Sequence, residues 1–156
     1  MELNFSVKLR KLERGKSNIN SACFVDSNVF LELELDQEHA DECEVFLNKV
    51  REGALRAITT GFHIDSILII MENYGKSPSD LETFLSSLLG YKGLEIYLLS
   101  ILDRISAIRW MDKLNLDLDD AIAYYIMKKL NIDKIVSYDR HFDSIKDIMR
   151  LEPSQL

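Results

Sequence analysis

The chain has 156 residues, of which 47% are hydrophobic and only two are proline, and its formal net charge is −7. These values exclude a disordered chain and fit one globular domain with a substantial core. No apolar run reaches the roughly 18 residues that a membrane-spanning helix needs, and no signal peptide opens the sequence, so we expect a cytoplasmic protein without membrane association.

The charge is distributed unevenly along the chain. Residues 1–20 carry five basic and two acidic side chains, which gives this segment a charge of +3 and leaves −10 for the remainder. It has no clean period, so we assign it no structure and name it the basic N-terminal arm, followed by one domain over residues 21–156. An acidic body suits a protein whose carboxylates hold divalent cations, although an ordinary acidic surface with a frayed terminus explains the same balance.

The domain begins with an apolar stretch followed by a polar turn. Residues 22–25 predict a buried strand, and Asp26, Ser27 and Asn28 follow at its carboxyl end. Residues 29–35 are apolar enough to begin a helix, but their alternation of leucine and glutamate equally fits an extended segment. Asp26 therefore stands at the end of a strand, which is where ligands bind in open α/β sheets.

Two helices flank the second predicted strand. Residues 39–50 place apolar side chains on one helical face, and Gly53 marks the end of that helix. Residues 54–59 predict the strand itself. The helix over 62–73 is apolar nearly all round, which predicts burial on most sides, and Asp65 in its first turn is the exception.

The middle of the chain predicts a helix, a strand and another helix. The first helix begins near Pro78, which suits a first turn, with Ser77 or Ser79 as its N-cap. Residues 94–99 predict a third strand, and residues 101–114 predict the helix that follows it.

The stretch over residues 118–143 is the one around which we expect the site to be organised. It contains a helix with Asp119 and Asp120 in its first turn, and then a short apolar strand over 135–138 with Asp139 at its carboxyl end. Either of the first two aspartates can cap the helix. Helix geometry favours Asp119 as the cap and Asp120 as a ligand.

The order of elements predicts a three-layer α/β domain with a mostly parallel central sheet, with residues 148–151 as a short edge strand. Asp26, Asp65, Asp120 and Asp139 should then lie at the same edge of the sheet. Four like charges in one place repel unless a cation lies among them, and oxygen ligands of this kind select Mg²⁺ or Mn²⁺. The two cysteines have no metal-ligand spacing, so we expect reduced core thiols and no zinc site.

Four motifs along the domain resemble those of the PIN domain family, which includes the toxin ribonucleases of the VapC type. In chain order these motifs are FVDSNVF, TTGFHID, LDDAIAYY and IVSYDRHFD. The resemblance implies a PilT N-terminus fold and metal-dependent cleavage of RNA phosphodiester bonds. It matches Asp26, Asp120 and Asp139 to the first, third and fourth acids of the family, and Ser27 and Asn28 to the small polar residues after the first acid.

Asp65 departs from the family pattern. The resemblance implies a glutamate at this position, and aspartate keeps the charge but is one methylene shorter, so that contact with the metal through water becomes an alternative to direct coordination. An ordinary first-turn carboxylate is nearly as good an interpretation of this residue. Arg140 and His141, which follow Asp139, could steady a substrate phosphate or could be exposed loop residues.

The leading hypothesis is a Mg²⁺- or Mn²⁺-dependent endoribonuclease, which the resemblance extends to the toxin of a toxin–antitoxin pair. Its expected partners are an RNA substrate, an antitoxin protein and a second copy in a homodimer. The alternative is a catalytically weak or inactive PIN scaffold that binds RNA or a protein partner. The catalytic and metal-binding residues expected are Asp26, Asp65, Asp120 and Asp139. The substrate-binding residues expected are Ser27, Asn28, Ser137, Arg140 and His141.

Overall fold

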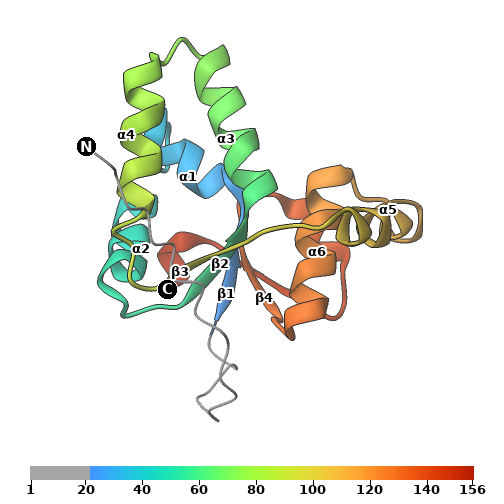
Figure 1. Ribbon diagram of the computed structural model, residues 1–156. Helices are drawn as coiled ribbons and strands as arrows, with labels where there is room; N and C mark the ends of the chain where they lie inside the picture. The colour runs from blue at the N-terminus through green and yellow to red at the C-terminus, as the bar shows by residue number, and fades with distance from the viewer. Residues whose placement is uncertain (1–21) are drawn as a thin grey trace.

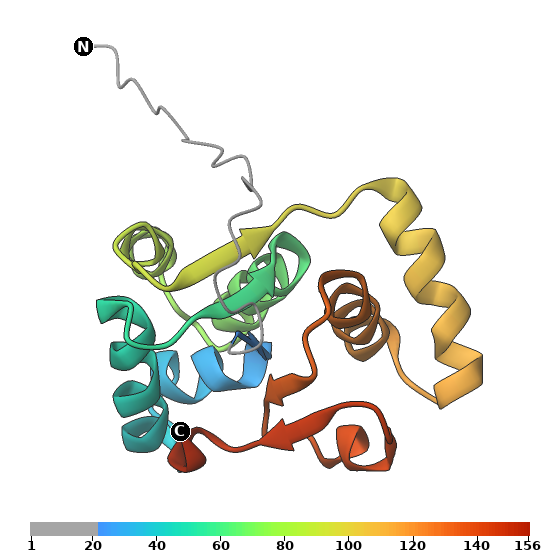
Figure 2. The ribbon, with the colours of Figure 1, turned by 90° about the horizontal axis from the view of Figure 1, so that it is seen from below.

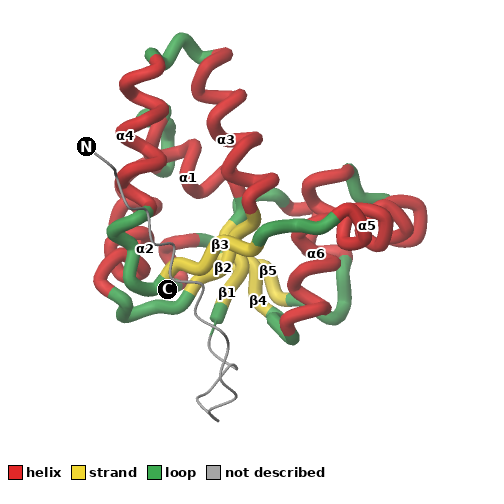
Figure 3. Tube along the Cα trace, in the orientation of Figure 1, coloured by secondary structure: helices red, strands yellow, loops and turns green. Residues whose placement is uncertain are grey.

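A five-stranded sheet runs through the centre of the protein (Figures 1 and 3). The computed structural model describes residues 22–156, so the basic N-terminal arm lies outside the described residues and the boundary at residue 20 stays a prediction. All strand pairs are parallel, in the order β3-β2-β1-β4-β5, which confirms the predicted sheet. The strands are β1 (Cys23–Val25), β2 (Ala57–Thr60), β3 (Leu94–Tyr97), β4 (Lys134–Val136) and β5 (Met149–Leu151).

Helices cover both faces of the sheet and complete the predicted three layers (Figures 1 and 2). Successive residues of a strand point to opposite faces, and β1 shows this directly. Val25 packs into the core beside α1 to α4, and Phe24 packs into the core beside α5 and α6. The helices are α1 (Ser27–Glu34), α2 (Ala40–Glu52), α3 (Gly61–Asn73), α4 (Pro78–Leu88), α5 (Ile101–Leu114) and α6 (Leu118–Leu130), with short 3-10 helices η2 (Arg140–Ser144) and η3 (Pro153–Gln155).

Local sequence signals define several helix ends. Gly53 ends α2 in the left-handed conformation at φ 84°, as predicted. Ser77 rather than Ser79 caps α4, because the Ser77 hydroxyl accepts from the backbone N–H of Asp80 while the Asp80 carboxylate accepts from the backbone N–H of Ser77. Asn131 ends α6 at φ 55°. The extended alternative after Asp26 is wrong, because these residues form α1.

The helix α3 is less buried than its composition predicts. Its buried residues lie on one side, whereas Ile69 is 58% exposed. The reason is visible in Figure 1, in which α3 and α4 run side by side away from the sheet, so that part of α3 has no covering layer. The expectation of burial on most sides is therefore wrong for the outer part of α3.

The remaining expectations about the core agree with the structure. Cys23 and Cys43 are free and buried, and burial raises the pKa of both thiols to about 11. The edge strand expected over 148–151 is β5. Among the helices of residues 22–156, none has the length and apolarity to cross a membrane.

Candidate acidic site

Asp26 lies at the carboxyl end of β1 and caps α1. Its Oδ1 accepts from the backbone N–H of Ser27 at 2.7 Å, and its Oδ2 accepts from the Ser137 hydroxyl at 2.6 Å and from the Asn28 amide at 3.2 Å. The side chain is buried, with 4% of the residue exposed. These three donors fix the direction of the Asp26 carboxylate.

The same network joins the ends of two neighbouring strands, β1 and β4. The Ser137 hydroxyl oxygen accepts from the Asn28 amide at 3.1 Å and from the backbone N–H of Asp139 at 3.0 Å. The Asn28 side-chain oxygen accepts from the backbone N–H of Tyr138 at 3.3 Å. Asn28 and Ser137 therefore orient Asp26, and binding of substrate by these two side chains stays a prediction.

The first turn of α6 brings further carboxylates to this edge of the sheet. The N-cap is Asp117, whose Oδ1 accepts from the backbone N–H of Asp120 at 3.2 Å, so the prediction that Asp119 is the cap is wrong. The helix already begins at Leu118, and Asp119 is inside the first turn, where it cannot occupy the extended conformation of a cap. Asp120 is 2% exposed, and its Oδ2 has no hydrogen-bond partner.

Two groups of potential ligand atoms share Asp120. In the first group, one carboxylate oxygen from each of Asp117, Asp119 and Asp120 lies within 4.8 Å of the other two. In the second group, one ligand atom from each of Asp120, Asp139 and His141 lies within 4.8 Å of the other two. The His141 Nδ1 is 3.2 Å from Asp139 Oδ1 and 3.7 Å from Asp120 Oδ2. We name these residues together with Asp26 the acidic site.

Burial and mutual repulsion make it costly to ionise all of these carboxylates. Burial raises the pKa of Asp26 to about 6, although the hydrogen bond from Ser137 lowers it. The charges of Asp139 and Asp117 raise it further. Burial, followed by the charges of Asp26 and three further aspartates, raises the pKa of Asp120 well above its ordinary range. Burial, followed by a hydrogen bond with Asp117 and the charges of Asp117 and Asp26, raises the pKa of Asp119 to about 6. The ionised forms of Asp26, Asp119 and Asp120 are therefore destabilised by their surroundings.

The donor set fits a divalent cation. It consists mainly of carboxylate oxygens, which are the ligands that Mg²⁺ and Mn²⁺ prefer, whereas the one imidazole nitrogen is a ligand typical of other first-row metals. The buried Asp120 Oδ2 accepts no hydrogen bond, with the exposed His141 ring 3.7 Å away, and a buried anionic oxygen is stable only when it is paired. A cation beside Asp120 would supply that pairing and reduce the repulsion from Asp26.

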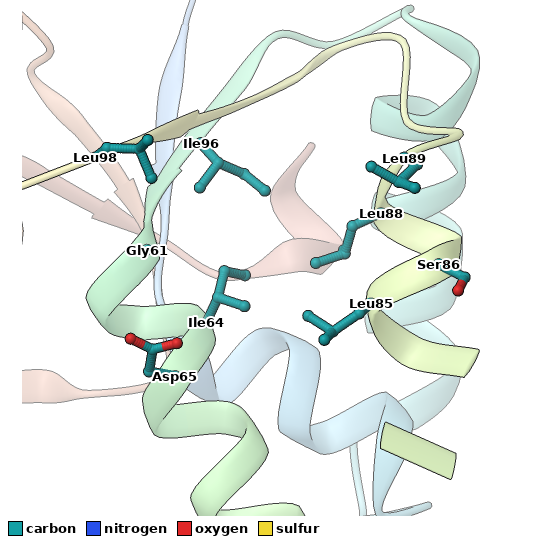
Figure 4. Close-up of a pocket in the computed structure, with 9 residues that line it drawn as sticks. All are labelled: Gly61, Ile64, Asp65, Leu85, Ser86, Leu88, Leu89, Ile96 and Leu98. Atoms are coloured by element: carbon teal, nitrogen blue, oxygen red, sulfur yellow. The ribbon is translucent and has the colours of Figure 1, made fainter. Parts of the chain in front are cut away.

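Asp65 lies on α3 but is not among the residues of the two groups. It is exposed and lines an apolar pocket between α3 and α4. In Figure 4, Ile64 is turned toward Leu85 of α4, whereas the Asp65 carboxylate lies away from them. Asp26 is also in neither group, but its charge acts on Asp119 and Asp120. The structure therefore brings three of the four predicted carboxylates into the acidic site, and the metal-binding roles of all four stay predictions.

The other predicted residues surround the site in different ways. Ser27 is buried, and its hydroxyl has no partner within the described residues. Arg140 is exposed at the start of η2. The side chain of His141 is 72% exposed beside the two carboxylates of its group, so these last two residues are accessible to a ligand.

His63 is a buried residue that lies next to the acidic site. Its Nδ1 is 2.7 Å from the Thr60 hydroxyl, whereas its Nε2 has no partner. Burial lowers its pKa to about 4, against an opposing effect of the Asp119 backbone, so the ring is neutral at neutral pH. Together with Asp117, it is a residue that we did not assign to the site from the sequence. The available signal was the spacing of polar residues at two helix starts, Thr-x-x-His and Asp-x-x-Asp.

Comparison with known proteins identifies the family. A family model described as PIN domain matches residues 23–148, and no curated protein matches the chain. VapC20 of Mycobacterium tuberculosis, described as a sarcin-ricin loop cleaving toxin, superimposes with a TM-score of 0.65 at 14% identity, covering 82% of this chain and 97% of that one. A chain of a toxin–antitoxin complex from Klebsiella pneumoniae superimposes with a TM-score of 0.62 at 13% identity, covering 84% and 97%. These structures show a shared fold, and the match of the family model over most of the domain shows that the chain belongs to the PIN domain family.

Proposed function

We propose that this protein is a divalent-metal-dependent endoribonuclease that hydrolyses RNA phosphodiester bonds at the acidic site. Membership of the PIN domain family and the likeness to a structure described as a sarcin-ricin loop cleaving toxin support this activity. The observation that carries the metal requirement is the buried Asp120 Oδ2, which accepts no hydrogen bond and interacts unfavourably with the charges of Asp26, Asp117, Asp119 and Asp139.

In this proposal the carboxylates of the acidic site hold the metal. Asp26 and Asp120 are the principal ligands, and Asp139 supports the same ion or a second one. Mg²⁺ or Mn²⁺, when bound, supplies an activated water at neutral pH and neutralises charge that develops on the phosphate. Ser137 and Asn28 keep the Asp26 carboxylate in one orientation, which prepares the ligand geometry before the ion binds.

The exposed side of the acidic site is where RNA would bind. Arg140 and His141 are accessible at the start of η2, and a guanidinium and an imidazole can both donate hydrogen bonds to phosphate oxygens. His141 lies against Asp139, so a phosphate bound by this ring is held close to the carboxylates. We include both residues as substrate-binding groups, together with Ser27.

We also propose a toxin role with an antitoxin protein as partner, a homodimeric state and a cytoplasmic location. The support for the antitoxin is that one similar structure is a toxin–antitoxin complex. The support for a protein interface is the exposure of apolar side chains on α5, where Ile101 is 71% and Leu102 is 73% exposed.

The inactive scaffold remains the second candidate because of Asp65. This residue is exposed and outside the two ligand groups, so one of the four carboxylates expected from the sequence lies outside the acidic site. A scaffold without a functional metal site would bind RNA or protein without cleaving it.

A cleavage assay with single-stranded RNA separates the two candidates. For the nuclease we expect cleavage with Mg²⁺ or Mn²⁺ and none in EDTA, and a loss on the order of a hundredfold in Asp120→Asn, since changes at or near metal ligands have effects of this size. Asp41→Asn is the matched control, because Asp41 is an exposed carboxylate in the first turn of α2. Asp65→Asn tests the remaining predicted ligand. Absence of both cleavage and metal-dependent thermal stabilisation in the unmodified protein would favour the scaffold.

A further inference from the structure

The strand β3 forms an exposed edge of the sheet. Within residues 22–156 it pairs only with β2, and an edge strand presents backbone N–H and C=O groups that another strand can pair with. Ile96 in this strand is 38% exposed, and Leu98 just beyond it is 76% exposed. Apolar side chains on an open edge are usually covered by another segment.

An apolar groove lies beside this edge. It has a volume of about 450 Å³ and lies between α3, α4 and β3. Figure 4 shows Leu85 of α4 facing Ile64 of α3 across the groove, with Ile96 and Leu98 along one side. Leu89 at its rim is 80% exposed. The groove is therefore an apolar surface that continues directly from the strand edge.

The two faces of β3 differ in chemistry. Leu94 packs into the core beside α1 to α4, and Ile96 lines the groove on that same face. Glu95 points to the opposite face, because successive residues alternate, and it is exposed. A segment that adds to this edge should therefore be apolar on one side and carry a cation on the other.

The basic N-terminal arm contains a segment with this pattern. The arm has no period over its full length, but its first ten residues alternate strictly, as a half-buried strand does. The apolar positions are Met1, Leu3, Phe5, Val7 and Leu9. The polar positions are Glu2, Asn4, Ser6, Lys8 and Arg10. Two of these polar residues are cations that could meet Glu95.

The connection to the domain is long enough for this segment to reach β3. Residues 11–21 join it to Ala22, which precedes β1. Strands are about 4.8 Å apart, so a strand outside β3 lies roughly 15 Å from β1, and eleven extended residues span about 35 Å. The strands β1 and β3 are parallel and begin at the same end of the sheet. A segment that runs antiparallel to β3 therefore has its C-terminal end at that same end of the sheet, where the connection to β1 starts.

We propose that residues 3–9 add to β3 as an antiparallel edge strand. Phe5, Val7 and the flanking leucines cover the groove, and Lys8 lies beside Glu95. A second copy meets this edge less well, because pairing of β3 with its own copy brings two Glu95 side chains onto one face, and like charges across strands are destabilising. The inference does not depend on the proposed ribonuclease activity.

Hydrogen exchange on the full chain tests this pairing. The amides of residues 94–98 are followed by mass spectrometry at a concentration where light scattering gives a monomer. The unmodified protein is compared with Phe5→Lys/Val7→Lys, which places charges on the apolar side. The matched control is Asn4→Lys/Ser6→Lys, which adds the same charge to the polar side. We expect exchange in residues 94–98 to be about tenfold faster in the first variant and unchanged in the control.

Three outcomes would overturn the proposal. Equal exchange in all three proteins would mean that the arm does not cover β3. Equal acceleration in both variants would mean that the alternating pattern has no role. Protection that appears only when light scattering gives a dimer would assign the edge to a second copy.

Discussion

Replacing Asp120 by asparagine should stabilise the metal-free protein. Asp120 is buried, its Oδ2 has no partner, and its side chain makes no hydrogen bond that the amide would break within the described residues. Asparagine has nearly the same shape but no charge. The substitution therefore removes repulsion with the neighbouring aspartates while preserving the packing of α6.

The size of the effect follows from the distances in the acidic site. An ionised Asp120 and an ionised Asp139 at 4.8 Å, the limit within which their ligand atoms lie, repel by about 3.5 kcal/mol at an effective dielectric constant of about 20. This value is an upper limit on what the substitution relieves, because the raised pKa of Asp120 lets the folded protein take up a proton instead. The side chain of Asp139 is 30% exposed, so water reduces this value. Loss of the favourable interaction with the helix N-terminus subtracts about 0.3–1 kcal/mol. We expect a net gain of about 1–2 kcal/mol, or roughly 3–8 °C in Tm for a domain of this size.

Thermal unfolding in EDTA and in Mn²⁺ measures the effect of the substitution on the stability of the metal-free and of the metal-bound protein. In EDTA, Asp120→Asn should melt above the unmodified protein. In Mn²⁺, the unmodified protein should gain stability, by about 2.7 kcal/mol at a hundred times the dissociation constant, and the variant should gain much less. The control Asp41→Asn also loses a first-turn carboxylate and should show neither effect. A lower Tm of Asp120→Asn in EDTA would refute the repulsion on which the metal assignment rests.

Three further predictions concern pH, capping and packing. In EDTA, lowering the pH from about 7.5 to about 5 should raise Tm, because the pKa values of Asp26, Asp119 and Asp120 are raised above an ordinary 3.8 in the folded protein, so that the folded state binds these protons more tightly than the unfolded state. The lowered pKa of His63 acts in the opposite direction below pH 6.5, and we expect the three carboxylates to outweigh it. A fall of Tm across this window would contradict it. In urea unfolding, Asp117→Ser should be about 1 kcal/mol more stable than Asp117→Ala, because serine retains the capping oxygen of α6; equal values would remove Asp117 as the cap. Gly93→Ala should lower the free energy of unfolding by about 3 kcal/mol, because a Cβ would lie 2.1 Å from the carbonyl oxygen of Leu55. Gly90→Ala is the control and should lower it by less than about 1 kcal/mol, because its nearest contact is at 3.4 Å. Similar values for the two variants would show that the backbone moves aside.

The sequence alone determined the type and order of most elements, because these depend on neighbours along the chain. Helical and alternating patterns, together with ends such as Gly53 and Asn131, act over a few residues. The placement of Asp26 and Asp139 also followed from the sequence, because parallel strands end at a common edge of the sheet. Strand ends were less accurate. The fourth strand ends at Val136 instead of residue 138, since pairing with neighbouring strands determines where a strand stops.

Only the tertiary structure decided which side chains face the acidic site. The N-cap of α6 is Asp117, two residues before the predicted one, and the direction of Asp65 depends on how α3 packs against α4 rather than on its position in a motif. The clearest case is the contact between Asn28 and Ser137, which are 109 residues apart in the chain. No local pattern specifies that contact, because it forms only when β1 and β4 become neighbours in the sheet.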